Sequence, residues 1–136
     1  THLDNFSKLS ALLPPFDKGL ASLIDRLKER GLFRSTAIMV AGEFGRTPKI
    51  NGQGGRDHWA RAMFALMAGG DVEGGQVIGE TDDRAGAPIG KGYSPDDLAA
   101  SFFQNIGINS KHEFQTNIGR PINLVRDGKP ISQLFS

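Results

Sequence analysis

A short apolar run, residues 36–41 (TAIMVA), ends abruptly at Gly42 and constrains the fold of this chain more than any other feature. Because the run does not alternate with polar residues, it predicts a strand covered on both faces, as in a parallel sheet. A buried helix is the competing interpretation, but Gly31 and Gly42 leave too few residues between them. After Gly42 the chain enters a polar, glycine-rich loop that ends at Asp57 and His58. A strand, a glycine and a polar loop in this order are typical of α/β folds, which present reactive groups at the carboxyl ends of strands.

The composition is that of an ordinary globular protein, with 38% hydrophobic and 23% charged residues in a length of 136. This length predicts a single domain spanning residues 1–136. The net charge of +1 and the absence of a basic stripe give no indication of nucleic-acid binding. Because the chain has no cysteine, any metal site must use carboxylate, imidazole or other oxygen ligands. No apolar run approaches the roughly 20 residues that span a bilayer, so we expect no membrane span.

Periodic apolar positions predict two helices. The first begins at Pro14-Pro15, which suit a first helical turn, and ends at the capping residue Gly31. The second begins with Ser94 as its N-cap, followed by Pro95, and stops at Gly107. The apolar faces of these two helices consist of Phe16, Leu20, Leu23, Ile24 and Leu27 in the first, and Leu98, Phe102, Phe103 and Ile106 in the second.

Further strands are predicted at residues 63–68 and, weakly, at 76–79, whereas the tail after residue 109 reads as mostly irregular. Residues 130–135 could dock a last apolar patch. Helix, buried strand, functional loop, buried strand and helix indicate an α/β, mostly parallel sheet with flanking helices. Two or three strands cannot cover themselves, so an edge strand should seek a partner. We therefore expect either a missing N-terminal half or a dimer partner to complete the sheet, and expect the chain to be part of a longer protein.

Three metal-capable clusters lie on separate segments: His2 with Asp4, Glu43 directly after the first strand, and Asp57 with His58. Imidazole and carboxylate ligands suit zinc, manganese or a similar divalent ion. Each cluster also has an ordinary explanation. His2 could be solvated, Glu43 could pair with Arg46 on the surface, and His58 could be structural. Asp57 is either a ligand itself or a partner that holds an imidazole ring.

Arg46, Lys49 and Arg56 lie in the same loop and could bind the oxygens of a phosphate or sulfate ester. The alternative is a solvated basic loop. The glycines Gly52, Gly54 and Gly55 match no phosphate-loop motif, because no lysine followed by Ser or Thr comes after them, and a nucleotide-binding P-loop is disfavoured. His112 lies among polar residues and is expected to be exposed.

Several motifs occur in an order that resembles a known family: residues 1–6 (THLDNF), 42–48 (GEFGRTP), 55–59 (GRDHW), 74–79 (GGQVIG) and 119–121 (GRP). Together they look like the C-terminal part of an uncharacterised bacterial sulfatase-like family, a branch of the alkaline phosphatase superfamily. The resemblance covers essentially the whole chain. It implies a doubly wound α/β fold whose N-terminal half, outside this chain, carries the nucleophile.

The resemblance also implies roles for individual residues. His2 matches a histidine whose preceding aspartate binds metal, and His58 resembles the distal histidine that completes a metal site. Glu43 stands where relatives place the aspartate of an Asp-His metal pair, and Phe44 stands in place of that histidine. The substitution by Phe44 implies one divalent metal (zinc, manganese or calcium) rather than two. Relatives of this type are often exported, which implies a periplasmic or exported bacterial protein.

Three functional hypotheses follow. In the first, the chain is the metal-binding C-terminal portion of a sulfatase- or phosphatase-like hydrolase acting on a small sulfate or phosphate ester, with His2, Glu43, His58 and Asp57 at the metal. In the second, it belongs to a non-catalytic protein that binds a ligand or partner, as the departure at Phe44 suggests. In the third, the glycine-rich loop is only a structural connection. Ser35, Thr36 and Thr47 have no nearby base in sequence and are poor nucleophile candidates.

Overall fold

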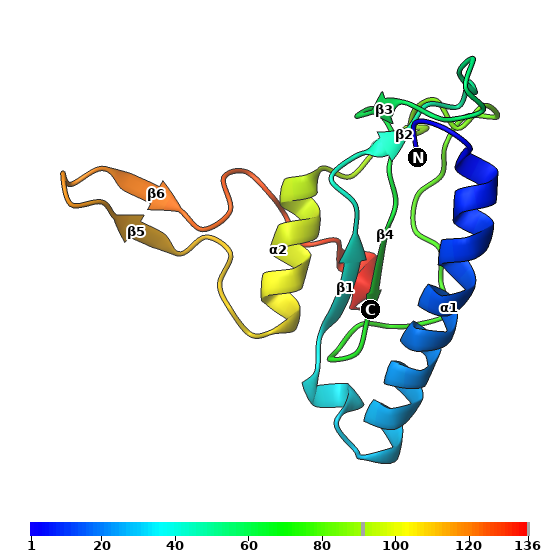
Figure 1. Ribbon diagram of the computed structural model, residues 1–136. Helices are drawn as coiled ribbons and strands as arrows, with labels where there is room; N and C mark the ends of the chain where they lie inside the picture. The colour runs from blue at the N-terminus through cyan, green and yellow to red at the C-terminus, as the bar shows by residue number, and fades with distance from the viewer. Residues whose placement is uncertain (91, 136) are drawn as a thin grey trace.

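The computed structural model describes residues 1–90 and 92–135 (Figure 1). Two long elements dominate it, the helices α1 (Asn5–Glu29) and α2 (Pro95–Asn105), which lie on opposite sides of a strand pair. The strands are β1 (Ile38–Ala41), β2 (Gly45–Arg46), β3 (His58–Trp59), β4 (Ala65–Ala68), β5 (Glu113–Gln115) and β6 (Pro121–Asn123). The described residues also contain two 3-10 turns, η1 (Phe33–Ser35) and η2 (Ser132–Leu134).

The strands of the described residues form three separate two-stranded sheets, and every pairing is antiparallel. In the central pair, Ile38 of β1 lies opposite Ala68 of β4, and Ala41 lies opposite Ala65. The prediction of a doubly wound α/β fold with a mostly parallel sheet is therefore wrong. A parallel pair needs a long crossover, usually helical. Here the connection between β1 and β4 instead contains the small β2–β3 ladder, which turns the chain back on itself.

The helix α1 begins nine residues earlier than the sequence indicated, at Asn5 rather than Pro14, and both prolines lie inside it. Its start is set by hydrogen bonds from the N–H groups of Asp4 and Asn5 to the distant loop of residues 51–57. A local sequence pattern cannot show such contacts. Its end follows the sequence prediction. Gly31 has φ of 69°, and the N–H groups of Gly31 and Leu32 donate to the carbonyls of Lys28 and Leu27. This is the Schellman arrangement, in which a left-handed residue closes the last turn.

The helix α2 begins as predicted at the Ser94 cap. The Ser94 hydroxyl accepts from the Asp97 N–H at 3.1 Å, and the Asp97 carboxylate accepts from the Ser94 N–H at 2.8 Å. Ser101 on this helix is fully buried, and its hydroxyl donates to the Asp97 carbonyl and accepts from the Ile131 N–H. Ala100, Val125 and Ile131 are the buried hydrophobic residues of the described chain. The small core thus lies between α2 and the C-terminal segment. Residues 130–135, which were predicted to dock an apolar patch, contribute Ile131 to this core.

The tail contains a hairpin that the sequence did not indicate. Strands β5 and β6 pair with Phe114 opposite Ile122, and the hairpin projects away from the helices (Figure 1). The turn at Gly119 closes through an N–H donated to the Thr116 carbonyl at 2.9 Å. Residues 76–79, a weak strand prediction, are irregular. The hairpin escaped notice because each strand has only three residues, too few to show a period.

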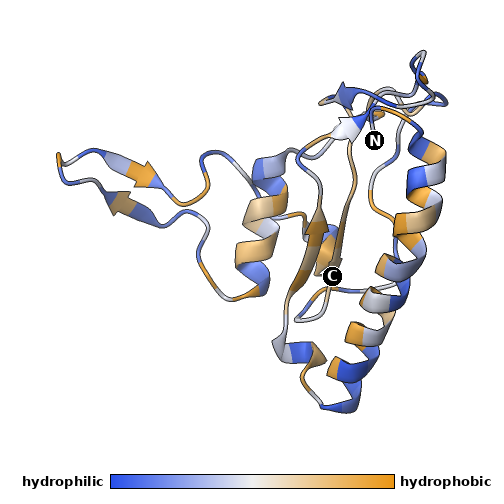
Figure 2. Cartoon of the chain, viewed as in Figure 1, coloured by the Kyte–Doolittle hydropathy of each residue, from blue (hydrophilic) through white to orange (hydrophobic). Residues whose placement is uncertain are grey.

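Apolar side chains remain widely exposed. Figure 2 shows β1 and β4 as the most hydrophobic ribbon, yet Met39 and Leu66 on these strands stay exposed. Phe64, just before β4, is 84% exposed. Within the described ranges, no helix is both long and apolar enough to cross a membrane.

Candidate functional site

The first five residues lie along the loop of residues 51–57, and this docking brings the N-terminal histidine to the small β2–β3 ladder (Figure 1). The N–H of Asp4 donates to the Gln53 carbonyl at 3.2 Å, and the N–H of Asn5 donates to the Gly54 carbonyl at 3.1 Å. Helix N-termini leave backbone N–H groups without helical partners, and here the loop supplies the acceptors. The N–H of Arg56 donates in the other direction, to the Thr1 carbonyl at 3.1 Å.

Gly55 is required for this close contact. It is buried, and a Cβ built on it would lie 1.9 Å from the carbonyl oxygen of His2. Because that atom belongs to the backbone, neither segment could accommodate a side chain without separating. The glycine therefore determines how closely residue 2 approaches the loop.

Asn51 joins the parts of the site. Its side-chain oxygen accepts from the N–H groups of Gln53 and Gly55 at 3.0 and 2.9 Å, which shapes the loop. Its side-chain nitrogen donates to the carbonyl of His2 and to the carboxylate of Asp57, both at 3.0 Å. The residue pattern did not single out Asn51, although an Asn before glycines is a recognised signal for a turn in which the side chain bonds its own backbone.

His2, Asp57 and His58 form the centre of the cluster. The Nδ1 atom of His2 lies 3.1 Å from the Asp57 carboxylate, and its Nε2 atom lies 2.9 Å from Nε2 of His58. All three side chains are exposed, with half of the His2 side chain accessible to solvent. Histidines 56 positions apart in sequence thus place their outer nitrogens together at the surface.

The neighbours of His2 indicate its tautomer. A carboxylate only accepts hydrogen bonds, so Nδ1 of His2 carries a proton and donates it to Asp57. Arg46 only donates, and its Nη1 lies 3.3 Å from Nε2 of His2, which therefore presents a lone pair. A carboxylate that holds an imidazole in this way is the usual companion of a metal-binding histidine.

The Asp57 carboxylate has a pKa below its usual value. The hydrogen bond from His2 is the largest cause, the hydrogen bond from Asn51 is the next, and the charges of His2 and His58 add to them, while slight desolvation opposes the shift. Asp57 is thus ionised at neutral pH and holds the His2 ring in place.

His58 is positioned by the β2–β3 ladder and by a neighbouring ring. It lies opposite Arg46 in the register, and the next residue, Trp59, donates its indole N–H to the Gly86 carbonyl at 2.7 Å. The Phe44 ring packs against the His58 ring with their centroids 4.1 Å apart. His2 covers part of the same imidazole, with 4.7 Å between ring centroids.

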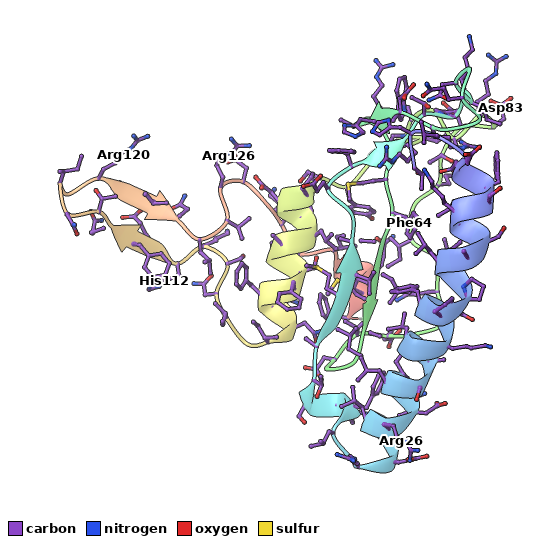
Figure 3. All side chains as sticks on the ribbon, viewed as in Figure 1. Arg26, Phe64, Asp83, His112, Arg120 and Arg126 are labelled. Atoms are coloured by element: carbon purple, nitrogen blue, oxygen red, sulfur yellow. The ribbon has the colours of Figure 1, made fainter. Side chains whose placement is uncertain are left out.

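The other predicted residues take different positions. Glu43 is exposed, and among the described residues no hydrogen bond or ion pair joins it to either histidine or to Arg46. Arg56 uses its guanidinium within the loop, donating to the Thr47 carbonyl at 2.9 Å, and lies over the Phe6 ring. Lys49 is exposed. The third histidine, His112, lies at the base of the β5–β6 hairpin, away from the cluster (Figure 3).

The cluster provides two ligands for a metal, not a complete set. In the part of the chain described by the structure, no three His, Asp or Glu side chains are arranged to hold an ion. Two imidazole ligands of a tetrahedral ion at 2.0–2.1 Å lie about 3.3 Å apart. The Nε2 atoms of His2 and His58, at 2.9 Å, need to part by only a few tenths of an ångström. Since His2 Nε2 presents a lone pair, the 2.9 Å contact is an N–H···N hydrogen bond donated by His58, and the two imidazoles would fit a divalent cation only after His58 Nε2 released that proton.

Comparison with known proteins assigns the chain to a family. Residues 1–135 match the family described as proteins of unknown function, DUF1501. The chain belongs to the DUF1501 family. No curated protein and no solved structure matches it. The DUF1501 match includes every residue of the cluster, so the histidine pair lies inside the family's domain.

Proposed function

We propose that this DUF1501 chain is the metal-binding portion of an ester hydrolase that acts on small sulfate or phosphate esters. The nucleophile lies outside these residues. His2 and His58 bind one divalent cation, and Asp57 holds the His2 ring. Among zinc, manganese and calcium, imidazole ligands favour zinc most and calcium least.

The observation that supports this proposal is the approach of the two Nε2 atoms, 2.9 Å apart, from segments that a buried glycine and an asparagine hold together. An exposed pair of imidazoles needs a reason to meet, because surface side chains lose conformational freedom when they are fixed. The hydrogen bond between the two Nε2 atoms is one reason, and a shared cation would be another. The resemblance of the loop motifs to sulfatase-like proteins supports the ester substrate.

Each residue has a separate task in this proposal. A bound divalent cation would act as a Lewis acid on an ester oxygen. Asp57 holds the Nδ1 proton of His2, which leaves the Nε2 lone pair facing His58 and Arg46, and the Phe44 ring packs against His58. Arg46 is placed to hold an anionic oxygen beside the cation, since its guanidinium reaches the same atom of His2.

A second candidate is a ligand-binding site without catalysis. The contact between Phe44 and His58 favours it, because an apolar ring packs beside His58 at the position where the resemblance implies a second metal-binding histidine. This candidate shares the cation site and differs only in whether a bound ester is cleaved.

Calorimetric titration of the chain with zinc tests the cation site. We expect one zinc per chain, and an affinity at least tenfold weaker in His2→Ala and in His58→Ala. His112→Ala is the matched control, since it removes a histidine outside the cluster and should leave the affinity unchanged. The proposal fails if the wild-type chain binds no zinc, or if all three variants bind it equally well.

Hydrolysis of an aryl sulfate and an aryl phosphate by the intact protein separates the two candidates. Cleavage that is lost in a chelator and restored by zinc supports the hydrolase and identifies the ester class. Zinc binding without cleavage of either ester supports the ligand-binding site instead.

A further inference from the structure

Arg46 lies beside the two imidazoles. It is opposite His58 in the β2–β3 register, and its Nη1 atom contacts Nε2 of His2 at 3.3 Å and the Arg56 carbonyl at 3.2 Å. Only this one nitrogen of the guanidinium is engaged, in the described part of the chain, by a hydrogen bond. A guanidinium presents five N–H donors in a planar fork, so most of the Arg46 donors have no acceptor among the described residues.

The guanidinium and a cation compete for the same atom. Nε2 of His2 has one lone pair, which lies within hydrogen-bond distance of His58 Nε2 and of Arg46 Nη1 and which a metal would need as well. Once a cation takes it, Arg46 loses that acceptor and stands beside a like charge, which is unfavourable. An oxyanion that bridges the cation and the guanidinium removes both penalties.

We infer that Arg46 couples the binding of a divalent cation at His2 and His58 to the binding of a tetrahedral oxyanion, the group shared by sulfate and phosphate monoesters. This inference rests on the proposed cation site. Without an oxyanion, Arg46 opposes the cation. With one, it donates two parallel hydrogen bonds to the oxyanion, and the cation and anion strengthen each other's binding reciprocally.

The other two cations of the loop are less suited to this task. The Arg56 guanidinium is half-buried and holds the Thr47 carbonyl, so it supports the loop itself. Lys49 is exposed and carries a single compact charge rather than a fork. Lys49→Gln therefore removes the same charge from the same loop and serves as the matched control for Arg46→Gln.

Zinc titrations in sodium sulfate and in sodium perchlorate of equal ionic strength test the coupling. For the wild-type chain we expect sulfate to tighten zinc binding by roughly fivefold or more, the lower range of measured couplings. In Arg46→Gln we expect tighter zinc binding in perchlorate, because a competitor is gone, and no effect of sulfate. A merely structural role for Arg46 would weaken zinc binding in both salts. Lys49→Gln should keep the sulfate effect.

The possible results separate this inference from the proposed function. Absence of zinc binding in either salt overturns the cation site. Zinc binding that sulfate leaves unchanged, or that sulfate tightens equally in Arg46→Gln, overturns the coupling alone. Arg46→Lys keeps the charge without the fork and is expected to fold and to show a weaker sulfate effect. An undiminished effect in the lysine variant would also contradict the assigned role of the fork.

Discussion

At the scale of single residues, the Asp57 carboxylate reports whether the cluster is assembled. Its pKa lies below its usual value of 3.8, chiefly because His2 donates to it. A carboxylate whose pKa is lower in the folded state contributes stability above its usual pKa. That contribution decreases as the pH falls below 3.8, through the folded-state pKa. Acidification below pH 3.8 should therefore weaken the hold of Asp57 on His2.

The titration of Asp57 provides a prediction for the chain without metal. Replacing His2 by Ala removes the largest cause of the shift, so we expect the Asp57 pKa to rise toward 3.8. Carboxyl ¹³C chemical shifts followed by NMR measure it directly. Lys49→Ala removes a charge of the same loop without touching the carboxylate and should leave the titration unchanged. An equal change in both variants would mean that the positive charge of the loop, and not the hydrogen bond from His2, sets the Asp57 pKa.

The close approach of Gly55 to residue 2 predicts the effect of a single methyl group. Gly55→Ala places a Cβ 1.9 Å from the His2 carbonyl oxygen, so the two segments must move apart. We expect a loss of roughly 1–3 kcal/mol in the free energy of unfolding, as in other overpacked sites. Contacts between the two imidazole rings in NOE spectra should disappear with it.

Gly52→Ala is the control for this substitution, because nothing lies within 4 Å of a Cβ at that position. It should preserve both the stability and the contacts between the rings. If Gly55→Ala kept the ring contacts, the glycine would not be what sets the position of His2.

At the scale of elements, the cap of α2 carries a measurable share of stability. The Ser94 hydroxyl accepts a hydrogen bond from the Asp97 N–H, and the Ser94 N–H donates one to the Asp97 carboxylate. We expect Ser94→Ala to lower the free energy of unfolding by about 1 kcal/mol, measured by urea denaturation. Ser7→Ala, at an exposed position within α1, should be nearly neutral. A loss as large at Ser7 would show that removing a hydroxyl, rather than the cap, explains the result.

The elements also show how far the sequence can predict this fold. The end of α1 at Gly31 and the start of α2 at Ser94 depend on neighbours within four residues, and a local pattern indicates both. The strands β1 and β4 were recognisable as apolar runs. Their antiparallel direction depends on the β2–β3 ladder between them, whose strands have two residues each. An apolar run carries no information about the direction of its partner.

The same limit applies to the candidate site. The residue types pointed to His2, Asp57 and His58 as metal-capable groups on separate segments. Which atoms meet depends on how the N-terminal segment docks along the loop of residues 51–57. Backbone hydrogen bonds and the Asn51 side-chain amide hold it there. Backbone contacts leave little trace in residue types, so the sequence could not assign Asn51 its role or separate Arg46 from Arg56.

At the scale of the whole molecule, the total exposed surface exceeds what a compact chain of this size shows. The accessible area is 9898 Å², whereas a folded monomer of 14.7 kDa exposes about 6,900 Å². An excess of roughly 3,000 Å² per chain is enough for a large, stable interface, which buries 2,000 Å² or more in total. The expectation of a partner that completes the sheet remains a prediction.

This excess predicts that the chain on its own associates with a second copy. Light scattering after size-exclusion chromatography should give a mass above that of one chain at high concentration. Phe64→Lys, beside β4, should weaken the association. Ile118→Lys is the control, because Ile118 is equally exposed, at 88%, but lies at the tip of the hairpin. A monomer at every concentration would contradict this prediction.

The large sequence separation of the two histidines has a consequence for the thermal stability of the molecule. His2 and His58 are 56 positions apart, so an ion shared by both would act as a cross-link that exists only while the N-terminal segment stays docked. An unfolded chain keeps its imidazoles apart and binds such an ion more weakly. Zinc should therefore raise the melting temperature in proportion to the logarithm of its concentration, and a chelator should reverse the rise. Heat resistance would then depend on the supply of metal as much as on the packing of the chain.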